Sequence, residues 1–533
     1  MTAALPDLPA RVQSERFRSG QVSAVEIVEA TLNRIEEVEG RPPSSAPYTP
    51  QASDLEKLHA YITITAERAR MQARALDQRR AAGESLGPLA GATLAVKDIF
   101  CVKDTPSTAG SRILEHFISP YTATAVARLE TAGAMVIGKA NMDEFAFGSS
   151  SESSAFLPPP GNPWNPAFVP GGSSGGSTAA VAAGEAALSI GTDTAGSIRQ
   201  PAAFCGVVGL KPTYGRVSRY GLIAFASSLD CPGPIGRDVE DVALMLEVMA
   251  GEDPHDATAA KLPVPSYQRD LEGDIEGLRI GLSPDYFRLK YPDPDTGELR
   301  EQAITAEIAE AVHEAARALA QRGAIIVEDI PMPNTRFGIP AYFVISRVEA
   351  ASNLHRYDGV KYGHRSQAHV DDLRVLYRKT RGEGFGLQPK LRILMGMYVS
   401  AEQYEKGYYQ QAMRIRTLIR QDFEAIFDPN GKYRLDALLS ATTPTTAFKI
   451  GQVYGDSVLM QYADLLTVAA NHAGIPALSI PAGFDSSDLP IGIQLMGADF
   501  EEGKLLKLGR AFELATAGAG WRNLKPAILR TDG

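Results

Sequence analysis

The sequence predicts an α/β protein in which helices cover a largely parallel or mixed β-sheet. From Gly91 onward, short β-prone runs alternate with amphipathic helical segments, a pattern typical of this class. The composition, with 44% hydrophobic and 22% charged residues among 533, is that of a folded globular chain. The sequence has no run of 18 apolar residues, so no membrane span is predicted. Residues 1–20 resemble neither a signal peptide nor a presequence. We therefore expect a cytoplasmic protein.

The first 85 residues are expected to form a helical layer. Ser23 and Glu26 make an S-x-x-E capping box, and apolar residues at helical spacing follow it, which predicts a helix over 24–39. Residues 41–52 contain four prolines and are expected to form a loop. Residues 67–82 are rich in Ala and Arg and are expected to form a solvent-facing helix.

The remaining elements follow the strand–helix alternation. Strands are expected at the short β-prone runs 93–96, 134–137, 324–327, 477–480 and 491–495. Helices are expected over 124–132 and around 304–319, each ending at a glycine that precedes the next strand. No repeat or long linker divides the chain, so we expect residues 1–533 to form a single domain.

Charge and cysteine content exclude several classes of function. The chain carries 53 basic and 63 acidic residues, a net charge of −10, which gives no general attraction for nucleic acid. Its three cysteines are too few and scattered for a disulfide framework or a zinc site, and H-E-x-x-H and C-x-x-C are absent. Neither G-x-x-x-x-G-K-[ST] nor G-x-G-x-x-G occurs. We expect no metal and no cofactor on this chain.

Residues 170–201 are the segment most suited to chemistry. Two turns of small residues flank a run of regular structure, 178–190, which would place the two turns beside each other. Glycine in such turns lets backbone N–H groups converge on one point, as an oxyanion or phosphate site requires. A flexible Gly/Ser linker is the alternative, but the flanking segments are wrong for one.

Two kinds of serine activation fit this segment. Residues 171–175 match the G-x-S-x-G nucleophile elbow, with Ser173 or Ser174 as nucleophile, but none of the eight histidines stands in a triad context. Lysine is the other possible base, and Lys97 ends a short apolar strand that would bury it. Burial can lower a lysine pKa by about three units from its usual value of about 10.4. Against this, Lys97 could pair with Asp98 at the surface.

Residues 170–201, PGGSSGGSTAAVAAGEAALSIGTDTAGSIRQP, resemble the signature of the amidase signature family. Ser173 follows Lys97 by 76 positions and Ser197 follows Ser173 by 24, close to the family's spacing. The resemblance implies that Lys97 is the base, Ser173 a bridging serine in a cis peptide and Ser197 the nucleophile. It also implies an oxyanion hole of backbone N–H groups at Thr194, Ala195 and Gly196.

The resemblance also implies the fold, a large central mixed sheet sandwiched by helices. In that fold, the helical layer 1–85 precedes the signature core 86–260, and 275–533 completes the sheet and the pocket. Several residues depart from the usual family pattern: Ala195 stands where glycine is common, Cys231 stands where glutamine is common, and Phe147, Ser151 and Ser153 also differ. A methyl group at 195 is tolerable unless that position needs a positive φ.

Within the family, the segment GLKPTYGRVSRYGL is most similar to the glutamine-hydrolysing A subunits of tRNA-dependent amidotransferases. That similarity implies ammonia supply for converting Glu-tRNA(Gln) to Gln-tRNA(Gln), with the Asp-tRNA(Asn) reaction left open. It implies the B and C subunits of such an amidotransferase as partners, with ATP and Mg²⁺ on the partner and the tRNA held mainly by the B subunit. A stand-alone amidase acting on another small amide is the alternative.

Three substrate-binding residues are carried over from the same similarity. Arg392 would pair with the substrate α-carboxylate, Asp464 would receive the α-ammonium or the side-chain amide, and Tyr342 would offer a hydroxyl. The plainer alternatives are a surface ion pair for Arg392 and Asp464, and core packing for Tyr342.

Overall fold

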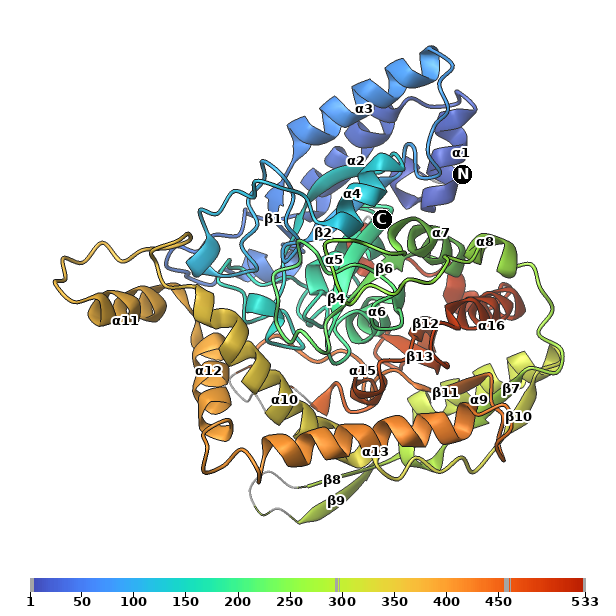
Figure 1. Cartoon of the computed structure of the whole chain (residues 1–533). Helices are drawn as coiled ribbons and strands as arrows, with labels where there is room; N and C mark the ends of the chain where they lie inside the picture. The colour runs from blue at the N-terminus through green and yellow to red at the C-terminus, as the bar shows by residue number, and fades with distance from the viewer. Residues whose placement is uncertain (1–3, 293–295, 297, 455–459, 461, 531–533) are drawn as a thin grey trace.

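The computed structural model describes residues 4–292, 296, 298–454, 460 and 462–530. An 11-stranded mixed sheet forms its centre, in the order β1-β3-β2-β4-β6-β5-β12-β13-β11-β7-β10, and helices flank it (Figure 1). The strands of this sheet are β1 (Tyr61–Ile64), β2 (Thr93–Lys97), β3 (Met135–Ala140), β4 (Leu188–Asp193), β5 (Val208–Lys211), β6 (Cys231–Gly236), β7 (Arg279–Leu282), β10 (Ile325–Val327), β11 (Ala437–Ala441), β12 (Ala477–Phe484) and β13 (Pro490–Met496). The predicted mixed α/β sheet is confirmed.

The helices before β7 are α1 (Ala10–Arg18), α2 (Ala24–Val38), α3 (Ala66–Ala81), α4 (Thr124–Thr131), α5 (Gly175–Ala182), α6 (Arg199–Cys205), α7 (Val239–Met249) and α8 (Tyr267–Asp270). Those after it are α9 (Ala306–Gln321), α10 (Gly338–Asn353), α11 (Leu373–Gly384), α12 (Leu387–Val399), α13 (Tyr409–Phe427), α15 (Val468–Ala473) and α16 (Glu502–Ala515). A separate antiparallel pair, β8 (Arg288–Pro292) and β9 (Leu299–Ala303), lies outside the main sheet.

The N-terminal layer is helical except for one edge strand. The capping box of α2 is confirmed: Ser23 Oγ accepts from Glu26 N at 3.0 Å, and Ser23 N donates to Glu26 Oε2 at 2.7 Å. The strand β1, which the sequence did not predict, pairs antiparallel with β3 at the edge of the sheet. Tyr61–Ile64 has only four residues. It forms a strand because it pairs with β3, which is distant in the sequence.

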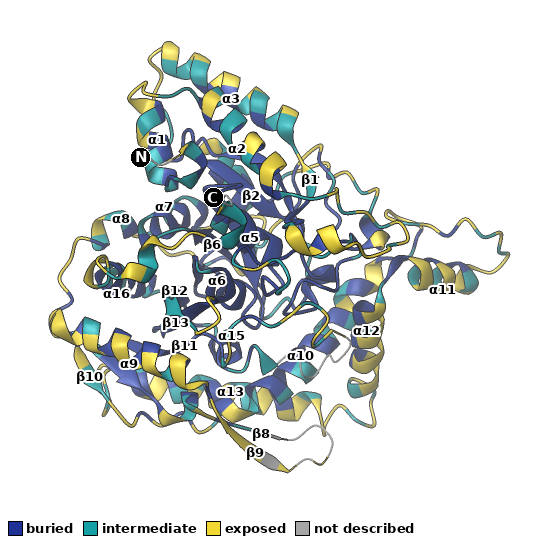
Figure 2. Ribbon diagram, turned by 180° about the vertical axis from the view of Figure 1, so that it is seen from behind, coloured by how far each residue is buried: buried dark blue, intermediate teal, exposed yellow. Residues whose placement is uncertain are grey.

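Strand β2 delivers Lys97 into the interior. It lies between β3 and β4, runs parallel to both, and all five of its residues are buried. A strand enclosed on both edges and both faces is expected to be apolar, as Leu94, Ala95 and Val96 are. Lys97 is its last residue and is 0% exposed, and the surrounding centre of the molecule is dark blue in Figure 2.

Helices α10, α12 and α13 form a layer at one end of the molecule (Figure 1). Each has a buried inner face and an exposed outer face, as the yellow turns of α12 and α13 in Figure 2 show. The inner faces of α10 and α12 carry buried polar residues, Tyr342, Arg347 and Arg392, toward the interior.

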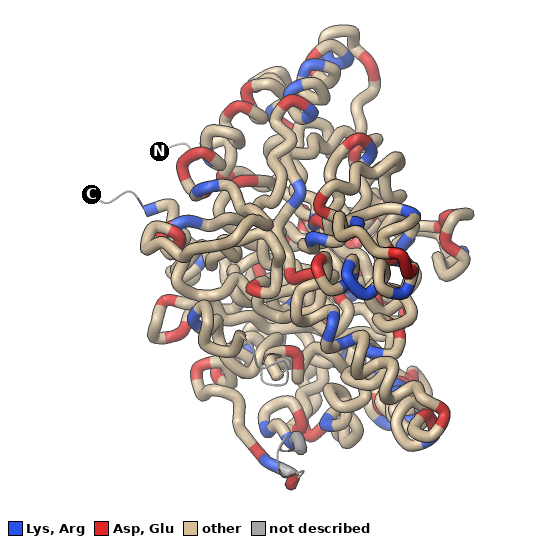
Figure 3. Tube along the Cα trace, turned by 90° about the vertical axis from the view of Figure 1, so that its left-hand side faces the viewer, with Lys and Arg blue, Asp and Glu red and all other residues tan. Residues whose placement is uncertain are grey.

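Charged residues of both signs alternate along the trace in the view of Figure 3. The acidic residues are therefore not gathered into a single segment of the trace in this view. Of the helices that the structure describes, none is both long enough and apolar enough to cross a bilayer.

The capping box gives a first prediction. Ser23→Ala removes the acceptor for Glu26 N and should lower the free energy of unfolding by about 1 kcal/mol. Amide hydrogen exchange in the first turn of α2 should speed up accordingly. Ser487→Ala, at an exposed turn, is the matched control and should leave both quantities unchanged; equal effects of the two variants would contradict the capping role.

Candidate active site

The amine of Lys97 is surrounded by hydroxyl groups. Its Nζ donates to Ser173 Oγ at 2.8 Å, to Ser174 Oγ at 2.8 Å and to Thr192 Oγ1 at 2.9 Å. These three acceptors occupy all the donors of an ammonium group, whereas a neutral amine would donate twice and accept once. Asp98 does not pair with Lys97; it binds Lys139 Nζ at 2.7 Å.

Burial favours the neutral form of this amine. It lowers the pKa of Lys97 to about 7, because the ammonium loses its hydration and the charges of Asp143, Asp193 and Asp230 offset only part of that loss. A lysine with a pKa near 7 is half neutral at neutral pH and can take a proton from a neighbouring hydroxyl.

The two small-residue turns lie side by side, as the sequence predicts. Ser174 N donates to Ser197 O at 3.2 Å, which joins the turn before α5 to the turn before α6. Ser173 follows a cis peptide bond with Gly172 and is fully buried. Ser197 is 4% exposed. The structure thus brings Ser173 onto the amine and joins the turn of Ser197 to the turn of Ser173, without a Ser173–Ser197 hydrogen bond among the described residues.

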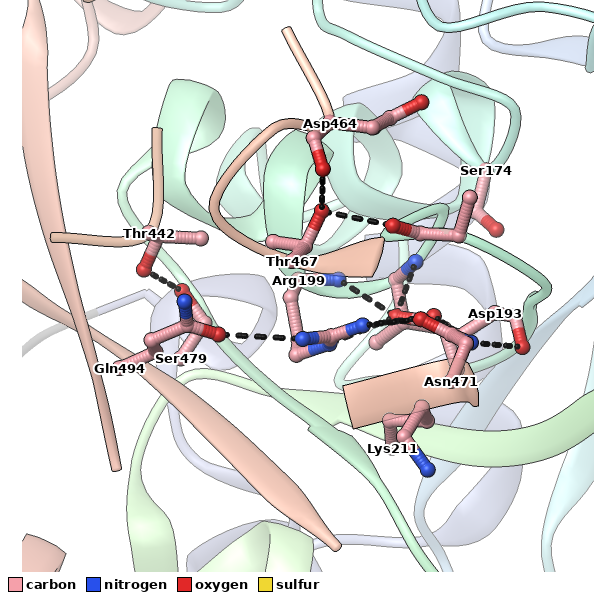
Figure 4. Close-up of polar contacts among 12 residues, drawn as sticks. Ser174, Asp193, Arg199, Lys211, Thr442, Asp464, Thr467, Asn471, Ser479 and Gln494 are labelled. Carbon is pink, nitrogen blue, oxygen red and sulfur yellow. Dashed lines mark hydrogen bonds and ion pairs between the residues drawn. The ribbon is translucent and has the colours of Figure 1, made fainter. Parts of the chain in front are cut away.

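A buried ion pair holds the Ser197 turn. The Asp193 carboxylate accepts from Arg199 Nε and Nη2, both at 3.0 Å, and from Asn471 Nδ2 at 2.8 Å. Arg199 Nη1 reaches Gln494 Oε1 at 3.0 Å, so the guanidinium bridges to β13 (Figure 4). Burial raises the pKa of Asp193, but the Arg199 charge and its hydrogen bonds outweigh it and lower the pKa overall. The four residues between Asp193 and Ile198 are therefore fixed at both ends.

The backbone of this turn is suited to receive an oxyanion. Among the hydrogen bonds of the described residues, none uses the N–H groups of Ala195, Gly196 or Ser197. Gly196 has a φ of +152°, and a Cβ there would lie 2.2 Å from Thr467 Oγ1, so only glycine fits. Ala195 does not have a positive φ, so its methyl group is tolerated. Thr467 Oγ1 donates to Ala195 O at 2.6 Å.

Asp464 lies directly over this turn. A Cβ on Gly196 would come within 2.8 Å of Asp464 Oδ1, an oxygen with no hydrogen-bond partner in the part of the chain that the structure describes. The other oxygen accepts from Ser149 Oγ at 2.6 Å. Burial raises the pKa of Asp464 to about 7. An ammonium group arriving at the free oxygen would favour the ionised carboxylate.

Arg392 is a buried guanidinium whose Nε, Nη1 and Nη2 have no hydrogen-bond partner among the described residues. It lies over the ring of Phe147, with Cζ 4.9 Å from the centroid, and 5.8 Å from that of Phe225. Burial lowers its pKa, and the charge of Asp464 is one of those that oppose this shift. An unpaired buried guanidinium is costly unless an anion joins it, so the fork of Arg392 is suited to a carboxylate ligand.

Tyr342 is buried on α10, and its ring meets that of Phe225 edge-on at 6.4 Å. Burial raises the pKa of Tyr342, and the positive charge of Arg392 opposes this rise. Neither Arg392 nor Asp464 forms a surface ion pair; both are buried. The substrate-binding roles of all three remain predictions.

Several residues of this site were not predicted from the sequence. The sequence indicates Ser174 only as an alternative nucleophile, and it assigns no role to Thr192, Asp193 or Arg199. Thr192 and Lys97 lie at the carboxyl ends of β4 and β2, which are parallel neighbours, so the ends of these two strands lie side by side. No group of three or more His, Cys, Asp or Glu side chains is arranged for a metal ion in the described ranges.

Comparison with known proteins places this chain in a family. A family model described as amidase matches residues 48–506. The A subunit of glutamyl-tRNA(Gln) amidotransferase from Carboxydothermus hydrogenoformans is 47% identical over 509 residues, 96% of this chain and 97% of that protein. The crystal structure of the corresponding A subunit from Thermotoga maritima matches with a TM-score of 0.72 and 32% identity, over 96% of each chain. Native peptide amidase from Stenotrophomonas maltophilia matches with a TM-score of 0.76 and 29% identity, over 97% of this chain and 98% of its own.

The lowered pKa of Lys97 predicts a pH-dependent stability. The pKa of Lys97 is about 7 in the folded chain and takes its ordinary value of 10.5 in the unfolded chain. At a pH between these two values the unfolded state binds more protons, so the free energy of unfolding rises with pH. Relative to Lys97→Met, the wild type should gain about 2 kcal/mol of unfolding free energy from pH 7 to pH 9.

Urea denaturation at several pH values measures this difference. Lys103→Met removes an exposed lysine and should run parallel to the wild type across the range. A constant gap between wild type and Lys97→Met would show that Lys97 keeps its ordinary pKa in the folded protein.

Proposed function

Because this chain belongs to the amidase family, we propose that it is the glutamine-hydrolysing A subunit of a tRNA-dependent amidotransferase. One structural observation carries the proposal: a buried amine that contacts hydroxyl groups, one of them Ser173, beside the turn that presents Ser197. The 47% identity to an amidotransferase A subunit over nearly the whole chain supports the choice of reaction.

In this mechanism, Ser197 Oγ attacks the side-chain carbonyl carbon of glutamine. Ser173 takes the Ser197 proton and passes its own to neutral Lys97, which lies 2.8 Å away. The backbone N–H groups of Thr194, Ala195, Gly196 and Ser197 stabilise the oxyanion, and losing one such donor typically raises the barrier by about 3 kcal/mol. Lys97 then returns the proton through Ser173 to the leaving group, ammonia departs, and water hydrolyses the glutamyl ester.

The buried charges above the turn would orient glutamine. Arg392 would bind the α-carboxylate, while the free oxygen of Asp464 would bind the α-ammonium, and Tyr342 would add a hydroxyl at the pocket wall. The two ends of the amino acid need opposite charges, and the two unpaired groups provide them. The side-chain amide would then point toward Ser197.

The ammonia would be used by partner proteins. The B and C subunits of the amidotransferase would complete a heterotrimer, with ATP, Mg²⁺ and Glu-tRNA(Gln) held mainly by the B subunit. Such a complex would work in the cytoplasm, where charged tRNA is made. The acidic net charge of −10 supports this division of labour, because tRNA binding needs a basic surface.

We also propose that residues 1–533 form one amidase unit. The sheet supports this, since β2 to β6 come from 86–260 and β7 and β10 to β13 from 275–533, joined where β5 pairs with β12. The N-terminal layer joins the same sheet through β1.

Ser197→Ala tests the proposal. In the co-purified complex, it should lower ammonia release from glutamine at least about 1,000-fold, since the covalent route is lost. Formation of Gln-tRNA(Gln) from Glu-tRNA(Gln) should fail with glutamine but persist with ammonium chloride. Ser177→Ala, another buried serine with no hydrogen-bond partner for its Oγ, should leave both reactions unchanged.

Retained glutamine hydrolysis in Ser197→Ala would exclude Ser197 as the nucleophile. A wild-type protein that purifies without partners and hydrolyses other small amides in preference to glutamine would instead be a stand-alone amidase.

A further inference from the structure

A second buried guanidinium lies near Arg392. Arg347, on α10, is 1% exposed, and its Cζ lies 3.8 Å from the ring centroid of Phe343 and 5.7 Å from that of Tyr342. Its Nη1 donates to Ser346 Oγ at 2.9 Å, while Nε has no hydrogen-bond partner. Helices α10 and α12, which carry the two arginines, pack against each other (Figure 1).

The two guanidinium groups act on each other and on Tyr342. Burial lowers the pKa of Arg347, and the positive charge of Arg392 lowers it further, while Tyr342 opposes these effects. No carboxylate among the described residues forms an ion pair with Arg347 or Arg392. Two like charges buried together without an anion repel each other, and a bound anion would relieve that repulsion.

Aromatic rings connect the two arginines. Arg392 lies over Phe225, Phe225 meets Tyr342 edge-on, and Tyr342 lies under Arg347. The face of an aromatic ring attracts a guanidinium, so these rings hold both cations without neutralising them. The surroundings of these two guanidinium groups are therefore positively charged before a substrate enters.

We propose that Arg347 determines specificity in this pocket. This role rests on the proposed function: Arg347 adds a second positive charge at the place that receives the substrate carboxylate. The pocket thereby selects amides that carry an α-carboxylate over amides whose corresponding group is uncharged. Arg392 supplies the hydrogen-bonding fork, and Arg347 strengthens the field that attracts the carboxylate.

The experiment compares two substrates, glutamine and its α-methyl ester, in the co-purified complex. Arg347→Met should raise KM for glutamine about tenfold or more, with kcat within about threefold, because binding of the charged group weakens while the serine chemistry is untouched. The KM for the ester, which has no carboxylate charge, should change by less than about twofold.

Two further variants serve as controls. Arg347→Lys keeps the charge and should bring KM for glutamine back to within about threefold of the wild type. Arg356→Met removes one exposed charge just beyond α10 and should change neither KM. Equal losses on both substrates in Arg347→Met, or no loss on either, would overturn the inference.

A binding measurement keeps the inference testable if catalysis is absent or Arg347→Met folds poorly. With the isolated chain carrying Ser197→Ala, glutamine should raise the melting temperature more than its methyl ester does. Adding Arg347→Gln should remove most of that difference. Persistence of the full difference in the Arg347→Gln protein would contradict a role in carboxylate selection. Absence of glutaminase activity in the wild type would instead count against the proposed function itself.

Discussion

The hydrogen bonds of a single buried amine determine how the rest of this site is built. Lys97 has hydroxyl oxygens and no carboxylate oxygen as its acceptors among the described residues. A carboxylate in their place would stabilise the ammonium and raise the pKa, whereas hydroxyls leave the cost of burial uncompensated. The strand β2 makes this burial possible, because it is enclosed by parallel neighbours on both edges.

The carboxylates whose charges act on Lys97 are Asp143, Asp193 and Asp230. All three are engaged elsewhere, and Asp143 accepts from Ser153 Oγ at 2.7 Å. Asp193 is tied to Arg199 and Asn471, Asp98 to Lys139, and Asp230 to Thr194 Oγ1 and to the backbone N–H groups of Phe225 and Ala226. Each of these contacts has a structural consequence of its own. The contact of Asp193 fixes the Ser197 turn, and that of Asp230 links Thr194 to the segment that carries Phe225 beneath Arg392. The position of the Ser197 turn and that of the residues around Arg392 are therefore coupled through buried carboxylates.

Local patterns explain how much of the fold the sequence predicts. The cap of α2, the alternation of strands and helices after Gly91, and the adjacency of the two small-residue turns depend on nearby residues, and all three occur in the structure. Edge strand β1 was not predicted, because its four residues become a strand only by pairing with β3. The placing of β12 and β13 at the centre of the sheet likewise depends on contacts between segments more than 200 residues apart.

The candidate site, like the fold, is predicted from the sequence only in part. Motif spacing and family resemblance select Lys97, Ser173 and Ser197, but Thr192 and Ser174 become visible only when β4 and the first turn converge on the amine. Arg347 lies in an otherwise ordinary helix, GIPAYFVISRVEAASN, where a single arginine reads as a surface residue. Its burial follows from the packing of α10 on α12, which no local pattern records.

The ionisation of Lys97 can be measured directly. With ¹³C at lysine Cε and the Lys97 signal assigned by its loss in Lys97→Met, an NMR titration reports the protonation of this one amine. The account predicts a midpoint near pH 7, in line with the pKa of about 7 that burial imposes. A midpoint near the ordinary 10.5 would mean a permanently charged ammonium at neutral pH, and the proposed proton transfer from Ser197 through Ser173 would be contradicted.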